Sequence, residues 1–394
     1  MKKQYLILLI VIYLAFIALG LPDALLGSAW NLVREDFSVS LGMLSIMSFA
    51  IYLMSLTATY NAPRLLRLFQ TKKITFISIC FTGFALIFIS FVSEFYQIIF
   101  FAIPLGLGAG AIDVSLNHYV ANNYKSKHMN FLHSFYGVGV TLGPFIMAMT
   151  LRNDTWRDGF LIVGLILLVI ALLVLLSFKL WHKEDTVKRN ESHAHISLFE
   201  MLKTRKVISS ISIFLIYVHI ESLAGIWIAS YFYIEKSVSY ATAALFTTVF
   251  YLALTIGRFI SGFISSKVSS QRLVIIGEIM IITSSFLLVI NNFDNLYLYF
   301  SIVFLLGLGC APIFPNMIFL NNSVFEKNKL SKIISLQMAV GYLGFGVLTP
   351  LAGILFDLFN ISFYPLLLLF LSVLTLVITV SYLNLKKNKK SSSI

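Results

Sequence analysis

The 394-residue chain is too apolar and too weakly charged for a soluble protein. Of its residues, 59% are hydrophobic and 12% are charged, whereas soluble domains carry about 25% charged residues. Together with a mean hydropathy of +0.90, this composition excludes a soluble enzyme and a disordered chain. Two cysteines, Cys80 and Cys310, are too few for a disulfide scaffold. The chain is therefore expected to be an integral membrane protein.

Long apolar runs divide the chain into twelve predicted membrane-spanning helices. A spanning helix needs about 20 apolar residues, and the runs are continuous rather than alternating, which favours helices over barrel strands. Pro312 and Pro315 are expected to break or kink the tenth helix. The predicted spans cover residues 5–29, 41–62, 74–93, 96–122, 129–150, 158–181, 206–233, 240–266, 272–291, 296–322, 332–356 and 360–384.

Basic residues set the predicted orientation in the membrane. When the N-terminus is placed inside, most of the 29 Lys and Arg residues fall in the inner loops and tails. The net charge of +12 is thus spread over every inner loop, which argues against a nucleic-acid partner. Both termini are expected to be cytoplasmic, in a multi-pass protein of the cell membrane. The exceptions are Arg34, Arg152, Arg157 and Lys236 in outer loops and Arg258 within a helix.

The predicted spans form two sets of six, separated by the longest polar stretch of the chain. This division gives an N-terminal half at residues 1–181, a cytoplasmic linker at 182–205 and a C-terminal half with a basic tail at 206–394. Internal similarity supports a duplication. The sequence Gly-Leu-Gly occurs at 106–108 and again at 307–309, in the fourth helix of each half.

Three acidic residues lie well inside the predicted spans, namely Asp23, Asp113 and Glu221. A charge at mid-bilayer costs at least about 2.5–3.5 kcal/mol on insertion scales, so such an acid marks a functional site. Asp23 follows Pro22, and its alternative role is to cap a break in the first helix. Glu278 lies nearer the inner end of the ninth helix and is expected to reach the membrane interface.

Asp113 is the leading candidate for carrying a coupling proton. It lies deep in the fourth helix after a glycine-rich stretch, and Asn117 shares its helical face. Protonation would remove the cost of burying its charge. The competing coupling acid is Asp23. The alternative for Asp113 is a structural carboxyl that is hydrogen-bonded to a neighbouring helix.

Other polar residues in the spans are candidate substrate contacts. His133 opens the fifth helix, where it serves as a hydrogen-bonding or titrating group or simply links two helices. Glu221 and Trp227 together suggest recognition of a polyol, because a carboxylate accepts hydroxyl protons and an indole stacks on C–H groups; Trp227 as an interface residue is the alternative. Asn316 and Gln337 are the remaining amides that could line a cavity.

The sequence contains no signature of an enzyme. It has no nucleotide-binding loop of the form G-x-x-x-x-G-K-[ST], no G-x-S-x-G nucleophile motif and no cluster of metal ligands at the usual spacing. We therefore expect no metal, no cofactor and no direct use of ATP.

Four segments of the chain carry a resemblance to a known family. They are GLGAGAIDVSLN at 106–117, MNFLHSFYG at 129–137, YVHIE at 217–221 with Trp227, and GRFISG at 257–262. These segments resemble transporters of the major facilitator superfamily, and within it the fucose:proton symporter family, which includes bacterial fucose and glucose permeases. The resemblance covers all twelve predicted helices and implies an all-α membrane fold of two parallel six-helix halves with a substrate site between them.

The resemblance also implies roles for individual residues. The family's helix 1 acid, tied to proton coupling, falls on Asp23. Its helix 4 acid, placed at the sugar site, falls on Asp113, where fucose permeases usually have Glu. His133 replaces a Gln of those permeases and Tyr136 replaces an Asn, and these departures argue against fucose itself as the solute.

These observations predict a secondary active transporter, not an enzyme. We expect proton-coupled uptake of a sugar or similar polyhydroxy solute by alternating access, through a protein that functions as a monomer in the lipid bilayer. The main alternative is a proton-driven exporter of drugs or hydrophobic metabolites, because 36 Phe and 11 Met residues could form an apolar cavity. A membrane receptor or scaffold is disfavoured by the lack of a sizeable soluble domain.

Overall fold

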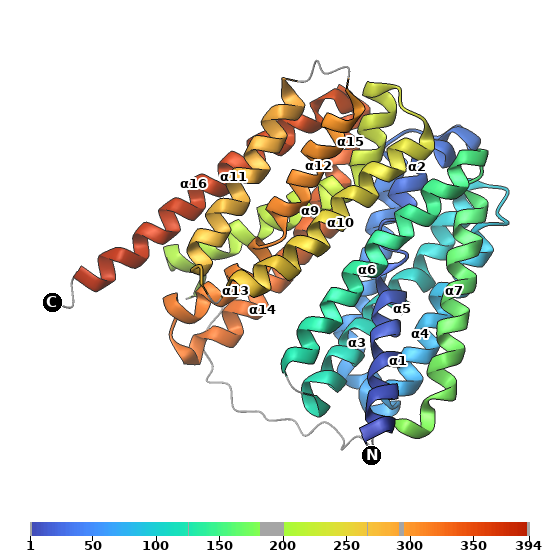
Figure 1. The fold of residues 1–394 in the computed structure, drawn as a ribbon, viewed down its shortest axis with the longest axis horizontal. Coiled ribbons are helices and arrows are strands. Elements are labelled where there is room, and N and C mark those ends of the chain that lie inside the picture. The colour runs from blue at the N-terminus through green and yellow to red at the C-terminus, as the bar shows by residue number, and fades with distance from the viewer. Residues whose placement is uncertain (1, 125, 182–200, 266, 291–294, 392–394) are drawn as a thin grey trace. The chain divides into compact units, whose positions relative to one another are not determined.

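The computed structural model describes residues 2–124, 126–181, 201–265, 267–290 and 295–391, and all regular secondary structure within them is helical (Figure 1). Twelve helical segments are long and apolar enough to cross a membrane among these residues. The prediction of an all-α membrane protein with twelve spans is confirmed. Most of the predicted linker, residues 182–200, lies outside the described residues.

Most spans are formed by a single helix, and the others are divided between two helices. The helices of the first six spans are α1 (Lys2–Gly20), α2 (Leu25–Asp36), α3 (Met43–Leu68), α4 (Thr71–Ile89), α5 (Phe95–Asn123), α6 (Ser126–Thr150) and α7 (Arg157–Leu176). Those of the last six are α9 (Arg205–Lys236), α10 (Tyr240–Ile264), α11 (Ser270–Val289), α12 (Leu296–Cys310), α13 (Ile313–Val324), α14 (Lys327–Leu343), α15 (Thr349–Phe359) and α16 (Tyr364–Ser391).

The helices form two compact units. Unit 1 comprises Met1–Asn190 and Ile228–Thr248, and unit 2 comprises Glu191–Trp227 and Val249–Ile394. In unit 1, α3 packs against α5, α4 packs against α5 and α7, and α1 packs against α6. In unit 2, α11 packs against α12, α13 and α16. Both α9 and α10 are divided between the two units. The boundary lies after Trp227 in α9 and after Thr248 in α10.

Three spans are interrupted within their apolar stretch. In the first, residues 21–24 form a turn between α1 and α2, and Pro22 has no N–H with which to continue the helix. In the tenth, Ala311 and Pro312 separate α12 from α13, at the position where the sequence predicts a break. In the eleventh, a π-helical turn at Gly344–Leu348 joins α14 to α15. Irregular backbone at membrane depth occurs where it is buried in protein or lines a polar cavity.

A capping box marks the short connection between the third and fourth spans. Glu94 is the N-cap of α5, and its side chain accepts from the backbone N–H of Gln97. In return, the Gln97 side-chain oxygen accepts from the backbone N–H groups of Ser93 and Glu94 at 2.9 and 3.1 Å. This arrangement satisfies N–H groups that a helix start leaves free and fixes the start of α5 at Phe95.

Large apolar side chains remain exposed on the helix exteriors. Examples are Leu176, Phe263 and Leu358, which are 71%, 80% and 71% exposed. Soluble proteins rarely expose extended apolar surface, whereas a bilayer solvates it. The exposed apolar faces therefore agree with a chain whose exterior contacts lipid.

Glycines allow α3 and α5 to pack in backbone contact. A methyl group at Gly106 would overlap the Ile51 carbonyl oxygen, and one at Gly110 would overlap the Ser55 carbonyl oxygen. Small residues at helix interfaces are a common basis of packing in membranes. The glycine-rich stretch before Asp113 thus fixes the position of α5 against α3.

Gly106→Ala is expected to destabilise the protein by about 1–3 kcal/mol, as overpacked substitutions do. Thermal unfolding of the detergent-solubilised protein, followed by tryptophan fluorescence, would measure the effect. Gly262→Ala is the matched control, because a methyl group there has no neighbour within 4 Å and alanine is the better helix former. Equal unfolding temperatures for the two variants would contradict the packing role.

Candidate functional site

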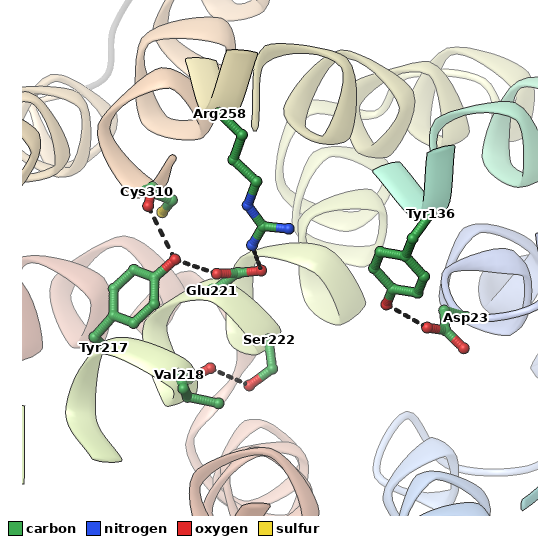
Figure 2. A network of polar contacts seen from close by, with 8 residues as sticks. All are labelled: Asp23, Tyr136, Tyr217, Val218, Glu221, Ser222, Arg258 and Cys310. Carbon is green, nitrogen blue, oxygen red and sulfur yellow. Dashed lines mark hydrogen bonds and ion pairs between the residues drawn. The ribbon is translucent and has the colours of Figure 1, made fainter. Parts of the chain in front are cut away.

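The break between α1 and α2 places Asp23 against α6. Tyr136 of α6 donates a hydrogen bond from its hydroxyl to the Asp23 carboxylate at 2.5 Å (Figure 2). The Asp23 side chain is exposed and lies in the turn rather than in a helix. Two predicted site residues that are far apart in the sequence are therefore brought together.

Glycines hold this break firmly against α6. A methyl group at Gly20 would overlap the Tyr136 carbonyl oxygen, one at Gly139 would overlap that of Ile17, and one at Gly143 would overlap that of Leu21. Backbone contact on both sides of Asp23 fixes the turn, and with it the position of the carboxylate.

Asp113 lies on α5 and is bonded within its own helix. Asn117 donates from Nδ2 to the Asp113 carboxylate at 2.8 Å and to the Asp113 backbone carbonyl at 2.9 Å. Both side chains are half-buried. The predicted pairing of the two residues on one helical face is observed. Among the described residues, no Lys or Arg forms an ion pair with Asp113 or Asp23.

His133 lies on α6 one turn before Tyr136 and contacts α1. Its ring meets that of Phe16 edge-on, with centroids 5.8 Å apart. The imidazole is exposed. Spacing of three residues places His133 and Tyr136 on the same face of α6, so α6 presents both toward the first span.

In unit 2, Glu221 lies in a charged cluster in the membrane-spanning part of α9. Arg258 of α10 donates from Nη2 to one carboxylate oxygen of Glu221 at 2.9 Å, and the Tyr217 hydroxyl donates to the other (Figure 2). That hydroxyl also lies 2.9 Å from the Cys310 carbonyl oxygen, at the end of α12 where the tenth span breaks. The side chains of Glu221 and Arg258 are 21% and 25% exposed, so the pair remains accessible.

Arg258 thus ties α10 to α9. The guanidinium balances the carboxylate charge, which lowers the cost of both groups in the membrane. The pair offers a charged acceptor and a charged donor side by side, and both are groups that bind hydroxyls strongly.

Trp227 lies apart from this cluster. It is fully buried, its indole N–H points to the Thr349 carbonyl oxygen at 3.4 Å, and its ring meets Phe356 edge-on. Thr349 follows the π turn and also contacts His219 at 3.0 Å and Ser222. The indole face is therefore enclosed by protein in this conformation and is not open to a ligand.

Asn316 and Gln337 are also buried and bonded to protein. Asn316 is 5% exposed and donates to the Ser261 hydroxyl at 3.2 Å. Gln337 is fully buried, accepts from Asn321 at 2.6 Å and donates to the Ser210 hydroxyl at 2.8 Å. These amides link helices of unit 2, and neither takes part in the Glu221 cluster.

The expectation that Glu278 reaches the membrane interface is wrong. Its side chain is 1% exposed, and one of its oxygens accepts from the Thr379 hydroxyl of α16 at 2.6 Å. Its position near the helix end suggested the interface. However, α11 packs against α16 on this face, which buries the carboxyl between the two helices.

This arrangement of helices has counterparts in known proteins. The family model of the Major Facilitator Superfamily matches residues 12–290 and 210–393. The chain belongs to the major facilitator superfamily. As a member it is a multi-pass membrane transporter and not an enzyme, as the sequence predicts.

Two relatives align with most of this chain. Bypass of stop codon protein 6 of Saccharomyces cerevisiae (strain ATCC 204508 / S288c) is 25% identical over 390 residues, which cover 89% of this chain and 77% of that protein. The glucose/mannose transporter GlcP of Bacillus subtilis (strain 168) is 21% identical over 349 residues, which cover 86% of each protein.

Solved structures of other transporters share the fold of this superfamily member. A mutant of the nucleoside transporter NupG gives a TM-score of 0.75 at 10% identity, over 97% of this chain and 99% of that one. A bacterial homolog of the human lysosomal transporter Spinster, inward-facing and occupied, gives 0.67 at 16% identity, over 98% and 97% of the two chains. At these identities, the likeness concerns the fold alone.

Sequence reasoning missed several polar partners in this transporter. Tyr217 and Thr349 contact predicted site residues, yet neither is charged. The signal for Thr349 was its position directly after the glycine-containing segment Gly344–Leu348, which forms a π turn in the structure. Such turns are frequent at functional sites.

Proposed function

We propose that this transporter imports a sugar or a similar polyhydroxy solute together with a proton, by alternating access. The observation that carries this proposal is that the three acids predicted at the site have two kinds of partner. Asp113 and Asp23 are bonded by the neutral groups of Asn117 and Tyr136. Glu221, by contrast, is paired with Arg258.

The two kinds of acid suit two different tasks. A carboxylate without a cationic partner becomes neutral when it binds a proton, which removes the cost of its charge in the membrane. Asp113 is therefore our first candidate for the coupling acid, and Asp23 is the second. In unit 1, the solute contacts the polar side chains that lie beside these acids, which are Asn117, His133 and Tyr136.

The Glu221–Arg258 pair suits recognition of hydroxyl groups. The carboxylate accepts hydroxyl protons and the guanidinium donates to hydroxyl oxygens, so a vicinal diol could bridge the pair. Tyr217 holds the carboxylate in position from the other side. Because Trp227, Asn316 and Gln337 are enclosed by protein, we propose that they shape unit 2 around this pair.

One of the two relatives supports the solute class. GlcP is a glucose/mannose transporter, and the segments around Asp113 and Glu221 resemble sugar:proton symporters. We propose the same class of solute here and membership of that finer family. The distribution of Lys and Arg supports cytoplasmic termini in the cell membrane, and we propose that one copy of the chain is sufficient for transport.

Uptake of a panel of labelled sugars into proteoliposomes tests the proposal. With an acidic exterior and an alkaline lumen, at least one sugar is expected to accumulate above the external concentration, and without the gradient it should only equilibrate. Failure of every sugar, combined with gradient-driven movement of hydrophobic drugs, would instead support the exporter.

A further inference from the structure

Glu35, near the end of α2, is held by two tyrosines. It accepts hydrogen bonds from the hydroxyls of Tyr233 at the end of α9, at 2.9 Å, and Tyr240 at the start of α10. The two phenol rings stack with centroids 4.6 Å apart and an interplanar angle of 18°. All three residues belong to unit 1. This group joins the end of the first span to the turn between the seventh and eighth spans.

A second stacked aromatic pair joins the end of α9 to the start of α10. Phe232 and Phe246 are fully buried and stack with centroids 3.6 Å apart. This second stacked pair joins the same two helices as the tyrosine pair. The other part of each helix belongs to unit 2. This part ends at Trp227 in α9 and begins after Thr248 in α10. A contact that holds their ends to α2 therefore restrains any motion of α9 and α10 relative to α2.

Behind this contact, three buried polar side chains have no hydrogen-bond partner. They are Asn31 (both amide atoms), Ser230 and Thr247, which are 2%, 0% and 0% exposed. Asn31 precedes Glu35 by four residues, and Ser230 precedes Tyr233 by three, so each shares the helical face of the residue that makes the contact. Thr247 lies two turns after Tyr240, on the same face of α10.

Unbonded polar groups are costly at such sites. A buried donor or acceptor without a partner destabilises the folded protein, and hydroxyls in helices commonly avoid this by bonding a carbonyl one turn earlier. Thr248, the next residue after Thr247, does so by donating to the Ala244 carbonyl at 3.1 Å. The side chains of Asn31, Ser230 and Thr247 make no such hydrogen bond. They lie on α2, α9 and α10, which are the three helices that the Glu35 contact joins.

We propose that Glu35, Tyr233 and Tyr240 form a latch that closes the predicted outer end of the transport path, and that Asn31, Ser230 and Thr247 line the path behind it. In the closed state these three side chains lack partners. When the latch opens, water and a hydroxyl-bearing solute reach them and form the missing hydrogen bonds. The latch rests on the alternating access of the proposed function but on neither the solute nor the coupling ion.

Chemical labelling of a cysteine behind the latch tests this inference. The reporter is Ser230→Cys in a background in which Cys80 and Cys310 are replaced by alanine, and the probe is a charged, membrane-impermeant methanethiosulfonate added to right-side-out vesicles. Replacing Tyr233 and Tyr240 by Phe removes the hydrogen bonds to Glu35 and keeps the rings. Hydrogen bonds to a charged group are strong enough that labelling is expected to accelerate about tenfold or more.

Two controls separate the latch from general loosening. Ser285→Cys on α11 is an equally buried reporter, since Ser285 is fully buried and also lacks a partner, and its labelling should not change. Tyr297→Phe removes a tyrosine hydroxyl from a residue that is 81% exposed and should leave Ser230→Cys unaffected. Glu35→Gln, which keeps an acceptor, provides a milder opening and should accelerate labelling less than the double Phe variant.

Equal labelling rates of Ser230→Cys with and without the two tyrosine hydroxyls would overturn the latch. So would equal acceleration of the Ser285→Cys control, or reaction only when the probe is added to inverted vesicles. No solute or gradient is present in this assay. A failure here therefore leaves the proposed solute and coupling ion untouched, and a negative uptake result leaves the latch untouched.

Discussion

Asp113→Asn is expected to abolish accumulation of the solute while leaving exchange of internal for external solute intact. The asparagine is permanently neutral, so the site can still bind solute and change conformation but no longer binds a proton. Asn117 retains a hydrogen-bonding neighbour at this position, because an amide oxygen replaces the carboxylate oxygen that it contacts. Gradient-driven uptake and counterflow in the same proteoliposomes measure the two activities.

Two further variants make the Asp113 result specific. Asp154→Asn neutralises an exposed acid in the turn after α6 and should transport normally. Asp23→Asn tests the competing coupling acid. It replaces the carboxylate that accepts a hydrogen bond from Tyr136. If Asp113→Asn accumulates solute normally while Asp23→Asn only exchanges it, the proton is carried by the first span, and our ranking of the two acids is reversed.

Glu221→Gln is expected to weaken solute binding about ten- to a hundredfold, since hydrogen bonds to charged groups contribute about 1.5–3 kcal/mol. The variant also leaves Arg258 without its counter-charge. For fully buried pairs such a loss costs about 3–5 kcal/mol of stability; the cost here is expected to be smaller because the two side chains are 21% and 25% exposed. Calorimetric binding and thermal unfolding of the purified protein measure the two effects.

The double variant Glu221→Gln with Arg258→Gln separates recognition from stability. It removes both charges together, so the unfolding temperature should recover toward the parent value while binding stays weak. Arg205→Gln is a control, because it removes an exposed positive charge at the start of α9. Binding that recovers with stability, or that never weakens in Glu221→Gln, would make Glu221 a residue of helix packing alone.

The spans and their breaks could be predicted from sequence because they depend on local properties. About twenty apolar residues span a membrane wherever they occur. Pro312 ends a helix because its nitrogen carries no hydrogen. The pairing of Asp113 with Asn117 follows from their spacing along one helix. For these features, neighbours in sequence determine the structure.

Contacts between helices were less accessible to sequence reasoning. By their position along a span, Glu278 and Trp227 resemble residues of the membrane interface, yet both are buried. Burial depends on how each helix is rotated about its axis and on which helices pack against it. Glu221 contacts Arg258 across 37 positions and Glu35 contacts Tyr240 across 205. No periodicity in the sequence relates such pairs, and only packing of the helices brings them together.

Solute-dependent proton movement tests the central claim most directly. Proteoliposomes are loaded with a pH-sensitive dye and held without an imposed gradient, and the transported sugar is then added outside. Coupled import predicts acidification of the lumen that depends on the sugar and is absent from Asp113→Asn. Sugar entry without any change in lumenal pH, or with alkalinisation, would contradict proton-coupled uptake.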